Sequence, residues 1–437
     1  ENTITRTEAE AINTNLLAEA TDIGRYNEVY LSVSKNFEKG NGKTFFTVTY
    51  RENNGQIKGI SSEKLITRVG MHYSLLENLD IVLASTNNMN YGKSSGASLN
   101  LLRPPFMPLY DENDKTGYWS PAANELILGD KRYRDSNSLS FGSSNYLKVN
   151  YTIPFIKGLS IGGRLQYAFG AGRGVNWYAE ELRTQANQEI SVAGESSSTG
   201  KSFLYRGETN YNRTFGDHNI KALLLGQATV GTGNGLLASG FNLNGSYHML
   251  GIPGTMKSMR STMTRSSSAY YIGRIAYSYK DKYLFEGNIR RDGISRLPKV
   301  NRYATFPSVG IGWIVSKETF FNVPLISLLK IRGSVGKTGN SGIPEFTYAS
   351  TYTINAASSK GYDNYMVSKI NNLASIVEWE KSDNIDIGFD YGLFSNRVNG
   401  SLAYYVKKIS GLLLEVPIPP STGMDGGSNT VWDNIGN

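Results

Sequence analysis

Glycine-rich segments are the first candidates for chemistry in this sequence, because such segments cradle phosphate groups in nucleotide-binding proteins. Gly336-Lys337-Thr338 has the ending of a phosphate-binding loop, but the pattern also requires a glycine at position 331, which is occupied by Ile331. Gly170-Ala171-Gly172-Arg173-Gly174 opens no helical pattern and is predicted to be a loop tip that follows a strand. Neither segment predicts a nucleotide cofactor.

Histidines and carboxylates do not form a recognisable catalytic or metal-binding set either. His72, His218 and His248 lie far apart in the sequence and lack the spacing of a metal motif. The absence of cysteine excludes disulfides, thiolate metal sites and cysteine nucleophiles. Carboxylate pairs such as Glu378 with Glu380, or Glu208 with Glu286, are explained by a solvated surface without acid–base chemistry. The sequence therefore predicts no enzyme activity, no cofactor and no metal site.

Alternation with a period of two residues is the dominant pattern in the chain and predicts β-strands. Between Leu159 and Phe169, apolar or aromatic side chains alternate with small or polar ones, so one face of the strand avoids water and the other seeks it. The same pattern is less regular over Ala269–Tyr279, where Tyr270 and Ile272 fall on the polar side. It recurs over 65–75, 203–211, 283–289, 385–391 and 398–404.

The connections between these strands distinguish a membrane barrel from a soluble β-sandwich, which alternation alone would also fit. Tight turns are expected at 37–42, 76–78, 154–158, 214–219, 280–282 and 392–397. Long gaps separate them at 87–141, 171–200, 230–266 and 337–381. Short turns at one end and long loops at the other are typical of outer-membrane barrels. We therefore predict an all-β, antiparallel transmembrane β-barrel with about fourteen strands in this chain.

Small polar residues and a short apolar pattern suggest how the segments outside these strands are built. Serine-rich segments at 196–198, 261–268 and 421–429 are expected in loops, and 8–20 is expected to form a short helix. Tyr277, Tyr279, Tyr283 and Trp313 lie near strand ends, as expected for an aromatic girdle at the membrane interface. Cross-strand aromatic pairing in a soluble sheet is the alternative interpretation of these rings.

Charged residues on the polar sides of the strands are expected to face the barrel lumen, because an arginine facing lipid at mid-membrane depth costs roughly 2–4 kcal/mol. Such residues either contact a substrate, or they hydrate the wall and pack against a plug. The lumen-facing candidates are Arg164, Arg206, Glu208, Arg274, Glu286, Arg290, Arg332 and Asp386.

Aromatic residues in or beside the long gaps are the candidates for substrate contact, because flat rings stack on sugars and on peptide side chains. These candidates are Tyr118, Trp119, Trp177, Tyr178 and Trp379. The formal net charge is +8, but lysines and arginines alternate with acidic residues along the chain and form no basic block. Nucleic acid is therefore not an expected partner.

Three segments in the second half of the chain resemble the SusC/RagA-type TonB-dependent importers of Gram-negative outer membranes. They are YLFEGNIRRDGISRLPKVNRYATFPSVGIGWIVSKETFF at 283–321, LKIRGSVGKTGN at 329–340, and the stretch 378–423. Within them, Asp292-Gly293 is predicted to form a turn with positive φ, and Pro417, Pro419 and Pro420 are predicted to end a strand.

The resemblance implies a multi-pass outer-membrane barrel of about twenty-two strands that imports large nutrients, either glycan oligosaccharides or peptides. It also implies an N-terminal plug pulled by the TonB-ExbB-ExbD complex, a SusD-like surface lipoprotein, and contact with lipid and lipopolysaccharide. Residues 1–437 are expected to form only a portion of the barrel, without the plug domain and the closing C-terminal strands. A passive porin and a surface β-sheet adhesin or binding protein are the alternatives.

Overall fold

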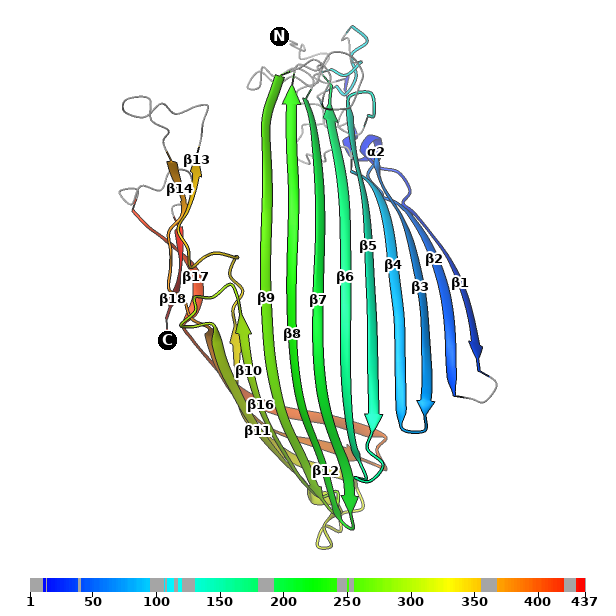
Figure 1. Cartoon of the computed structure of the whole chain (residues 1–437), viewed down its shortest axis with the longest axis vertical. Helices are drawn as coiled ribbons and strands as arrows, with labels where there is room; N and C mark the ends of the chain where they lie inside the picture. The colour runs from blue at the N-terminus through cyan, green and yellow to red at the C-terminus, as the bar shows by residue number, and fades with distance from the viewer. Residues whose placement is uncertain are drawn as a thin grey trace.

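The computed structural model describes residues 11–12, 14–37, 41–94, 106, 108–113, 117–119, 130–179, 192–241, 250, 255–354, 368–419 and 430–436. Strands dominate these residues, and the longest of them stand side by side in one curved sheet (Figure 1). None of the described helices has the length and apolar composition required to cross a membrane.

The main sheet contains fourteen strands, as the sequence predicted. They are β1 (Arg25–Asn36), β2 (Gly42–Asn54), β3 (Ile60–Leu76), β4 (Leu79–Ser94), β5 (Arg134–Thr152), β6 (Leu159–Tyr178), β7 (Val192–Phe215), β8 (His218–Phe241), β9 (Thr255–Tyr279), β10 (Tyr283–Ile294), β11 (Tyr303–Ile314), β12 (Ile326–Asn340), β15 (Glu380–Leu393) and β16 (Val398–Ser410). Two small hairpins pair β13 (Thr351–Ile354) with β14 (Ser368–Asn372) and β17 (Leu412–Pro417) with β18 (Thr430–Ile435).

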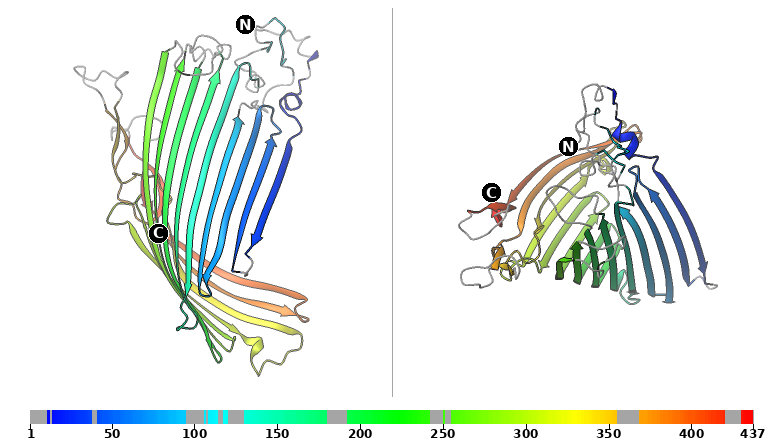
Figure 2. Two further views of the ribbon diagram at one scale, coloured as in Figure 1. Left: turned by 45° about the vertical axis from the view of Figure 1, so that its right-hand side comes forward. Right: turned by 90° about the horizontal axis from the view of Figure 1, so that it is seen from above.

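Each strand of the main sheet pairs antiparallel with the next one along the chain, and β12 pairs with β15 because the β13–β14 hairpin lies between them in sequence. The six predicted tight turns all fall between paired strands at one end of the sheet, and the long connections lie at the other end. The sheet curves strongly about its long axis (Figure 2). Because β1 and β16 each have one strand neighbour among the described residues, both edges of the sheet remain open there.

Four strands extend well into the segments 171–200 and 230–266, which were predicted as long gaps. β6 has 20 residues, β7 and β8 have 24 each, and β9 has 25, whereas about 9–11 residues suffice to cross a bilayer. The segment Gly170–Gly174 therefore lies inside β6 and is not a loop tip. The serine-rich segments 196–198 and 261–268 lie inside β7 and β9, so their assignment to loops was wrong. Residues 421–429 lie outside the described residues.

The predictions for the two ends of the chain are met in part. The helix near the N-terminus is α2 (Leu16–Ala20), where the Asn15 side chain accepts a hydrogen bond from the Ala18 amide at 3.1 Å. Residues 8–10 lie outside the described residues. Pro417 is the last residue of β17, as expected of a residue that cannot donate to the ladder, whereas Pro420 lies outside the described residues.

Gly293 corrects the prediction of a turn at Asp292-Gly293. This glycine belongs to β10 and has no positive φ. A Cβ at this position would lie 2.3 Å from the Tyr303 ring, which belongs to the paired strand β11. The glycine is therefore required by close packing across the strands and not by the backbone conformation of a turn.

Exposed apolar side chains form a band on one face of the main sheet, which we call the apolar belt. The strand registers place its members on the same side of neighbouring strands, and Leu165 is typical, with 52% of its surface exposed. Apolar side chains left uncovered on this scale match a surface that faces lipid. Its members include Leu31, Val33, Phe46, Leu65, Val69, Leu83, Ile161, Leu165, Tyr205, Leu224, Ile275, Ile289, Ile311, Val335, Ile387 and Leu402.

Aromatic rings form a row across the strand ends nearest the tight turns. The ring centroids of His218 and Tyr279 are 4.8 Å apart, those of Tyr279 and Tyr283 are 6.3 Å apart, and those of Tyr283 and Trp313 are 6.4 Å apart. The Trp313 indole N–H donates to Glu318 Oε1 at 3.1 Å, so its polar end is satisfied beyond the end of the strand. This is the arrangement expected of an interfacial aromatic girdle.

The apolar belt predicts that an introduced charge destabilises the protein much more on this face of the sheet than on the opposite face. Leu165→Arg should lower the free energy of unfolding by roughly 2–4 kcal/mol, because it places a charge in lipid near the middle of the belt. Thr229→Arg, on the opposite face of β8, is the matched control and should have a much smaller effect. Urea unfolding of the protein in lipid vesicles, followed by tryptophan fluorescence, measures both. Equal destabilisation by the two variants would contradict a lipid-facing belt.

Candidate functional site

The face opposite the apolar belt, which we call the polar face, carries all eight charged residues that the sequence singled out. Cross-strand registers align Arg164 with Arg206 directly, and Glu286 lies on the neighbouring strand to Arg274. Their placement on one face is a matter of strand parity, since successive side chains point to opposite sides. That this face lines a lumen remains a prediction.

Three of the five candidate arginines on the polar face are paired with carboxylates. Arg274 lies 2.8 Å from Glu286, and Arg290 lies 2.6 Å from Asp292 in the same strand. Arg332 Nη1 lies 2.7 Å from Asp386, and its Nε lies 3.4 Å from Asp390. These side chains are partly exposed, so the pairs compensate charge and contribute little to stability.

Arg206 is held instead by uncharged groups that the sequence did not single out. Its Nε and Nη2 donate to Gln227 Oε1 at 2.9 and 2.7 Å, and the Tyr270 hydroxyl donates to the same oxygen at 3.0 Å. In the sequence, Tyr270 stood out only as an interruption of the apolar pattern in β9. The strand register explains it, because Tyr270 lies opposite Gln227 on the polar face.

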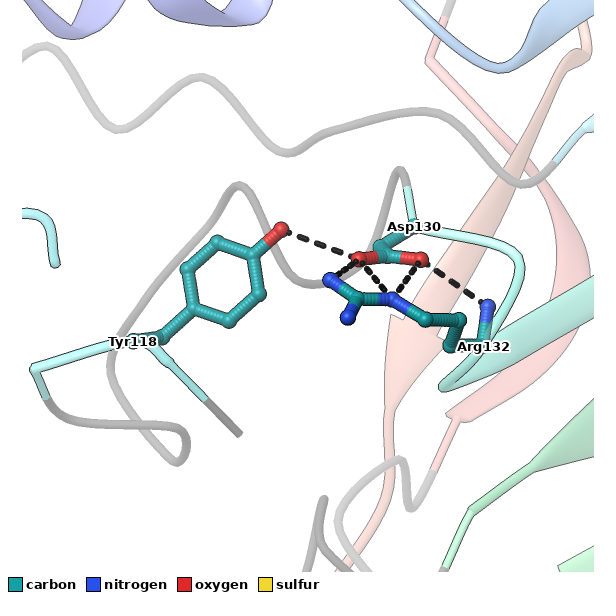
Figure 3. A network of polar contacts seen from close by, with 3 residues as sticks. All are labelled: Tyr118, Asp130 and Arg132. Carbon is teal, nitrogen blue, oxygen red and sulfur yellow. Dashed lines mark hydrogen bonds and ion pairs between the residues drawn. The ribbon is translucent and has the colours of Figure 1, made fainter. Parts of the chain in front are cut away.

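A second group of candidate residues lies at the end of the sheet with the long connections. The Tyr118 hydroxyl donates to Asp130 Oδ2 at 3.2 Å, and Arg132 Nη2 donates to the same oxygen at 2.6 Å (Figure 3). The backbone amide of Arg132 also donates to Asp130 Oδ1, at 2.9 Å. One carboxylate therefore fixes both an aromatic ring and a guanidinium.

The ionisation of this group follows from its partial burial. Burial, followed by the adjacent Asp130 carboxylate, raises the pKa of Tyr118 to about 12. Burial alone would raise the pKa of Asp130, but hydrogen bonds from the side chain and backbone of Arg132 outweigh it and lower that pKa. At neutral pH the phenol is protonated and the carboxylate is charged, which is the combination that the hydrogen bonds require.

Two of the five aromatic candidates for substrate contact, Trp177 and Trp379, are buried. The first of them is Trp177. It is 6% exposed and packs in a cluster with Tyr133, Ala179 and Ala193, against which Tyr118 and Leu250 also pack. Packing accounts for the position of Trp177 and leaves little of its ring for a ligand. Tyr178 and Trp119 are only partly buried, and the Arg134 guanidinium lies 5.2 Å from the Tyr178 ring centroid.

Trp379 occupies a second buried cluster, built from segments far apart in the sequence. It is 9% exposed, its ring lies 5.6 Å from that of Phe306, and its indole N–H donates to the Arg302 carbonyl at 3.3 Å. The rest of the cluster comprises Leu297, Ile343, Val377 and Leu413. Trp379 thus ties the β10–β11 connection to the segment before β15. Among the described residues, no group of three potential ligands is placed to hold a metal ion.

Comparison with known proteins identifies the family of this sheet. The family described as "TonB dependent receptor-like, beta-barrel" matches residues 84–437. The chain belongs to this family. The transmembrane β-barrel fold and the outer-membrane location, predicted from the strand pattern together with its short turns and long loops, are therefore confirmed, as is the resemblance to SusC/RagA-type transporters.

Individual members of the TonB-dependent receptor family show how much of a whole protein the chain represents. It is 27% identical to TonB-dependent receptor P39 of Formosa agariphila, over 95% of the chain and 40% of that protein. It is 25% identical to TonB-dependent receptor SusC of Bacteroides thetaiotaomicron, over 86% of the chain and 40% of that protein. The RagAB peptide transporter has the same fold, with a TM-score of 0.81 at 18% identity over 97% of the chain and 48% of that structure's chain. The chain thus spans about two fifths of the length of these curated relatives.

Asp130→Asn should lower the pKa of Tyr118 from about 12 toward its ordinary value, because a neutral amide removes the negative charge beside the phenol. A raised pKa contributes stability below the unfolded value near 10, and this contribution is lost as the pH rises through about 12. Ultraviolet difference titration against Tyr118→Phe, in each background, isolates this tyrosine from the others. An unchanged titration would show that Asp130 does not control the phenol.

The buried Trp177 and the partly buried Trp119 should respond differently to replacement by alanine. Trp177→Ala should destabilise the protein by roughly 3–5 kcal/mol, because it empties a buried cluster. Trp119→Ala, at a partly buried position, should cost much less. Thermal unfolding in detergent compares the two variants. A larger loss of stability for Trp119→Ala than for Trp177→Ala would contradict the assignment of Trp177 as the structural ring.

Proposed function

We propose that the chain is the barrel portion of a TonB-dependent importer that carries large nutrients, glycan oligosaccharides or peptides, across the outer membrane. The family match over 84–437 is the observation that carries this proposal. The similarity to SusC and the fold shared with the RagAB peptide transporter support it. The protein performs no covalent chemistry in this proposal.

The two faces of the sheet provide the physical route for such transport. The polar face lines the lumen, where the eight charged candidates contact cargo or hydrate the wall against a plug. Tyr118, Trp119 and Tyr178 offer partly buried aromatic surface at the long-connection end, where cargo would first meet the barrel. Trp177 supports Tyr118 through the cluster against which that ring packs, and Trp379 supports the β10–β11 connection.

Further strands from outside this chain are proposed to pair with the open edges of β1 and β16 and complete the barrel. The proposed partners are a SusD-like surface lipoprotein at the long-connection end and the TonB-ExbB-ExbD complex, acting through a plug. Lipid and lipopolysaccharide would contact the apolar belt.

Uptake by whole cells tests active import against its alternatives. Deletion of the gene should abolish uptake of labelled oligosaccharides or peptides that the parent strain takes up, and a protonophore or loss of TonB should do the same. Uptake that requires the gene but continues without energy would identify a passive porin. Uptake unaffected by the deletion, together with loss of surface attachment, would identify an adhesin. Restoration by the intact gene is the control.

A further inference from the structure

Three basic side chains stand directly opposite one another on β5, β6 and β7. The register pairs Lys148 with Arg164 and Arg164 with Arg206. Together with Gly163 and Glu208 they line a small recess in the polar face. Like charges directly opposite one another destabilise a sheet unless something compensates them.

The compensation within the described residues is incomplete. Glu208 lies 3.7 Å from Lys148, so one carboxylate stands against three cations in this recess. Arg164 Nη2 donates to the neutral Gln166 amide oxygen at 2.7 Å, and its guanidinium lies 4.4 Å from the Tyr146 ring centroid. Arg164 Nε is buried and donates to no group of the described chain. Arg206 is likewise held by a neutral amide, that of Gln227.

Other arginines on the polar face are compensated by carboxylates. Arg274, Arg290 and Arg332 each have a carboxylate of their own at 2.6–2.8 Å. These arginines of β9, β10 and β12 are therefore balanced, whereas positive charge is left in excess across β5–β7. The excess lies where two arginines are paired directly across β6 and β7 and line the same recess. Guanidiniums bind planar oxyanions through paired N–H groups.

We propose that Lys148, Arg164 and Arg206 form a binding site for a carboxylate group on the polar face. The carboxylate comes either from acidic cargo or from an acidic side chain of the whole protein that fills the lumen. This inference rests on the proposed function, since it requires the polar face to be reached by one of these groups. Gln166 and Gln227 act as positioning residues, because each fixes one guanidinium by a hydrogen bond without neutralising its charge.

Citrate is the probe for a site that remains open to cargo. Isothermal titration of the full-length protein in detergent should show binding that weakens at least about tenfold in the double variant Arg164→Gln/Arg206→Gln, because two charge-assisted contacts are lost. Arg68→Gln/Lys221→Gln is the matched control. It removes the same charge from exposed positions of β3 and β8 that do not line the recess, and it should bind citrate as the wild type does.

If an acidic side chain of the protein already fills the site, citrate should not bind, and the double variant should instead lower the melting temperature more than the control does. The difference should shrink at high salt. A double variant that matches the control in both citrate binding and melting temperature would overturn the proposal. If the double variant does not assemble, Lys148→Gln replaces it. This variant should weaken citrate binding or lower the melting temperature in the same way but by less.

The uptake experiment separates this inference from the proposed function. Citrate binding that depends on the two arginines in a protein that supports no uptake would leave the site standing and remove the transport proposal. Energy-dependent uptake by a protein whose citrate binding and melting temperature do not depend on the two arginines would support the transport proposal and remove the carboxylate site.

Discussion

The bilayer's hydrocarbon core offers no hydrogen bonds, so every backbone N–H and C=O that enters it must pair within the protein. The antiparallel ladders of the main sheet meet this requirement strand by strand. The same requirement makes an open edge costly, which supports the proposal that further strands pair with β1 and β16 in the membrane. It also fixes the side chains, because a strand that is fully paired must point alternate residues at lipid and at the interior.

The alternation of apolar and polar side chains predicted a strand wherever the two faces of that strand lie in different environments. Leu159–Phe169 shows this contrast, and the structure places it within β6 with the expected faces. Beyond Phe169 the contrast disappears, because Gly170, Gly172 and Gly174 have no side chains to mark one face. The strand nevertheless continues, since cross-strand hydrogen bonds do not need apolar side chains. Sequence patterns therefore predicted the membrane part of the strands and missed their extensions.

Long-range contacts explain the other differences between sequence and structure. Trp177 and Trp379 were grouped with the candidates for substrate contact because they lie in or beside long connections. Their burial depends on residues distant in the chain, such as Leu250, which packs against the cluster of Trp177, and Phe306, whose ring contacts that of Trp379. Gly293 was assigned to a turn from its local dipeptide, whereas the Tyr303 ring on the paired strand determines its role. No local pattern contains this information.

Charge on the polar face was predicted by type and parity, but its pairing was not. Arg290 and Asp292 are two residues apart, and their pairing follows from lying on the same face of one strand. Arg206 and Gln227 meet only because β7 and β8 adopt one particular register, and a shift of one residue would turn Gln227 toward lipid. The register is set by the short turn at Gly216, which has a positive φ. A tight turn at one end of the sheet thus determines which side chain holds an arginine in its middle.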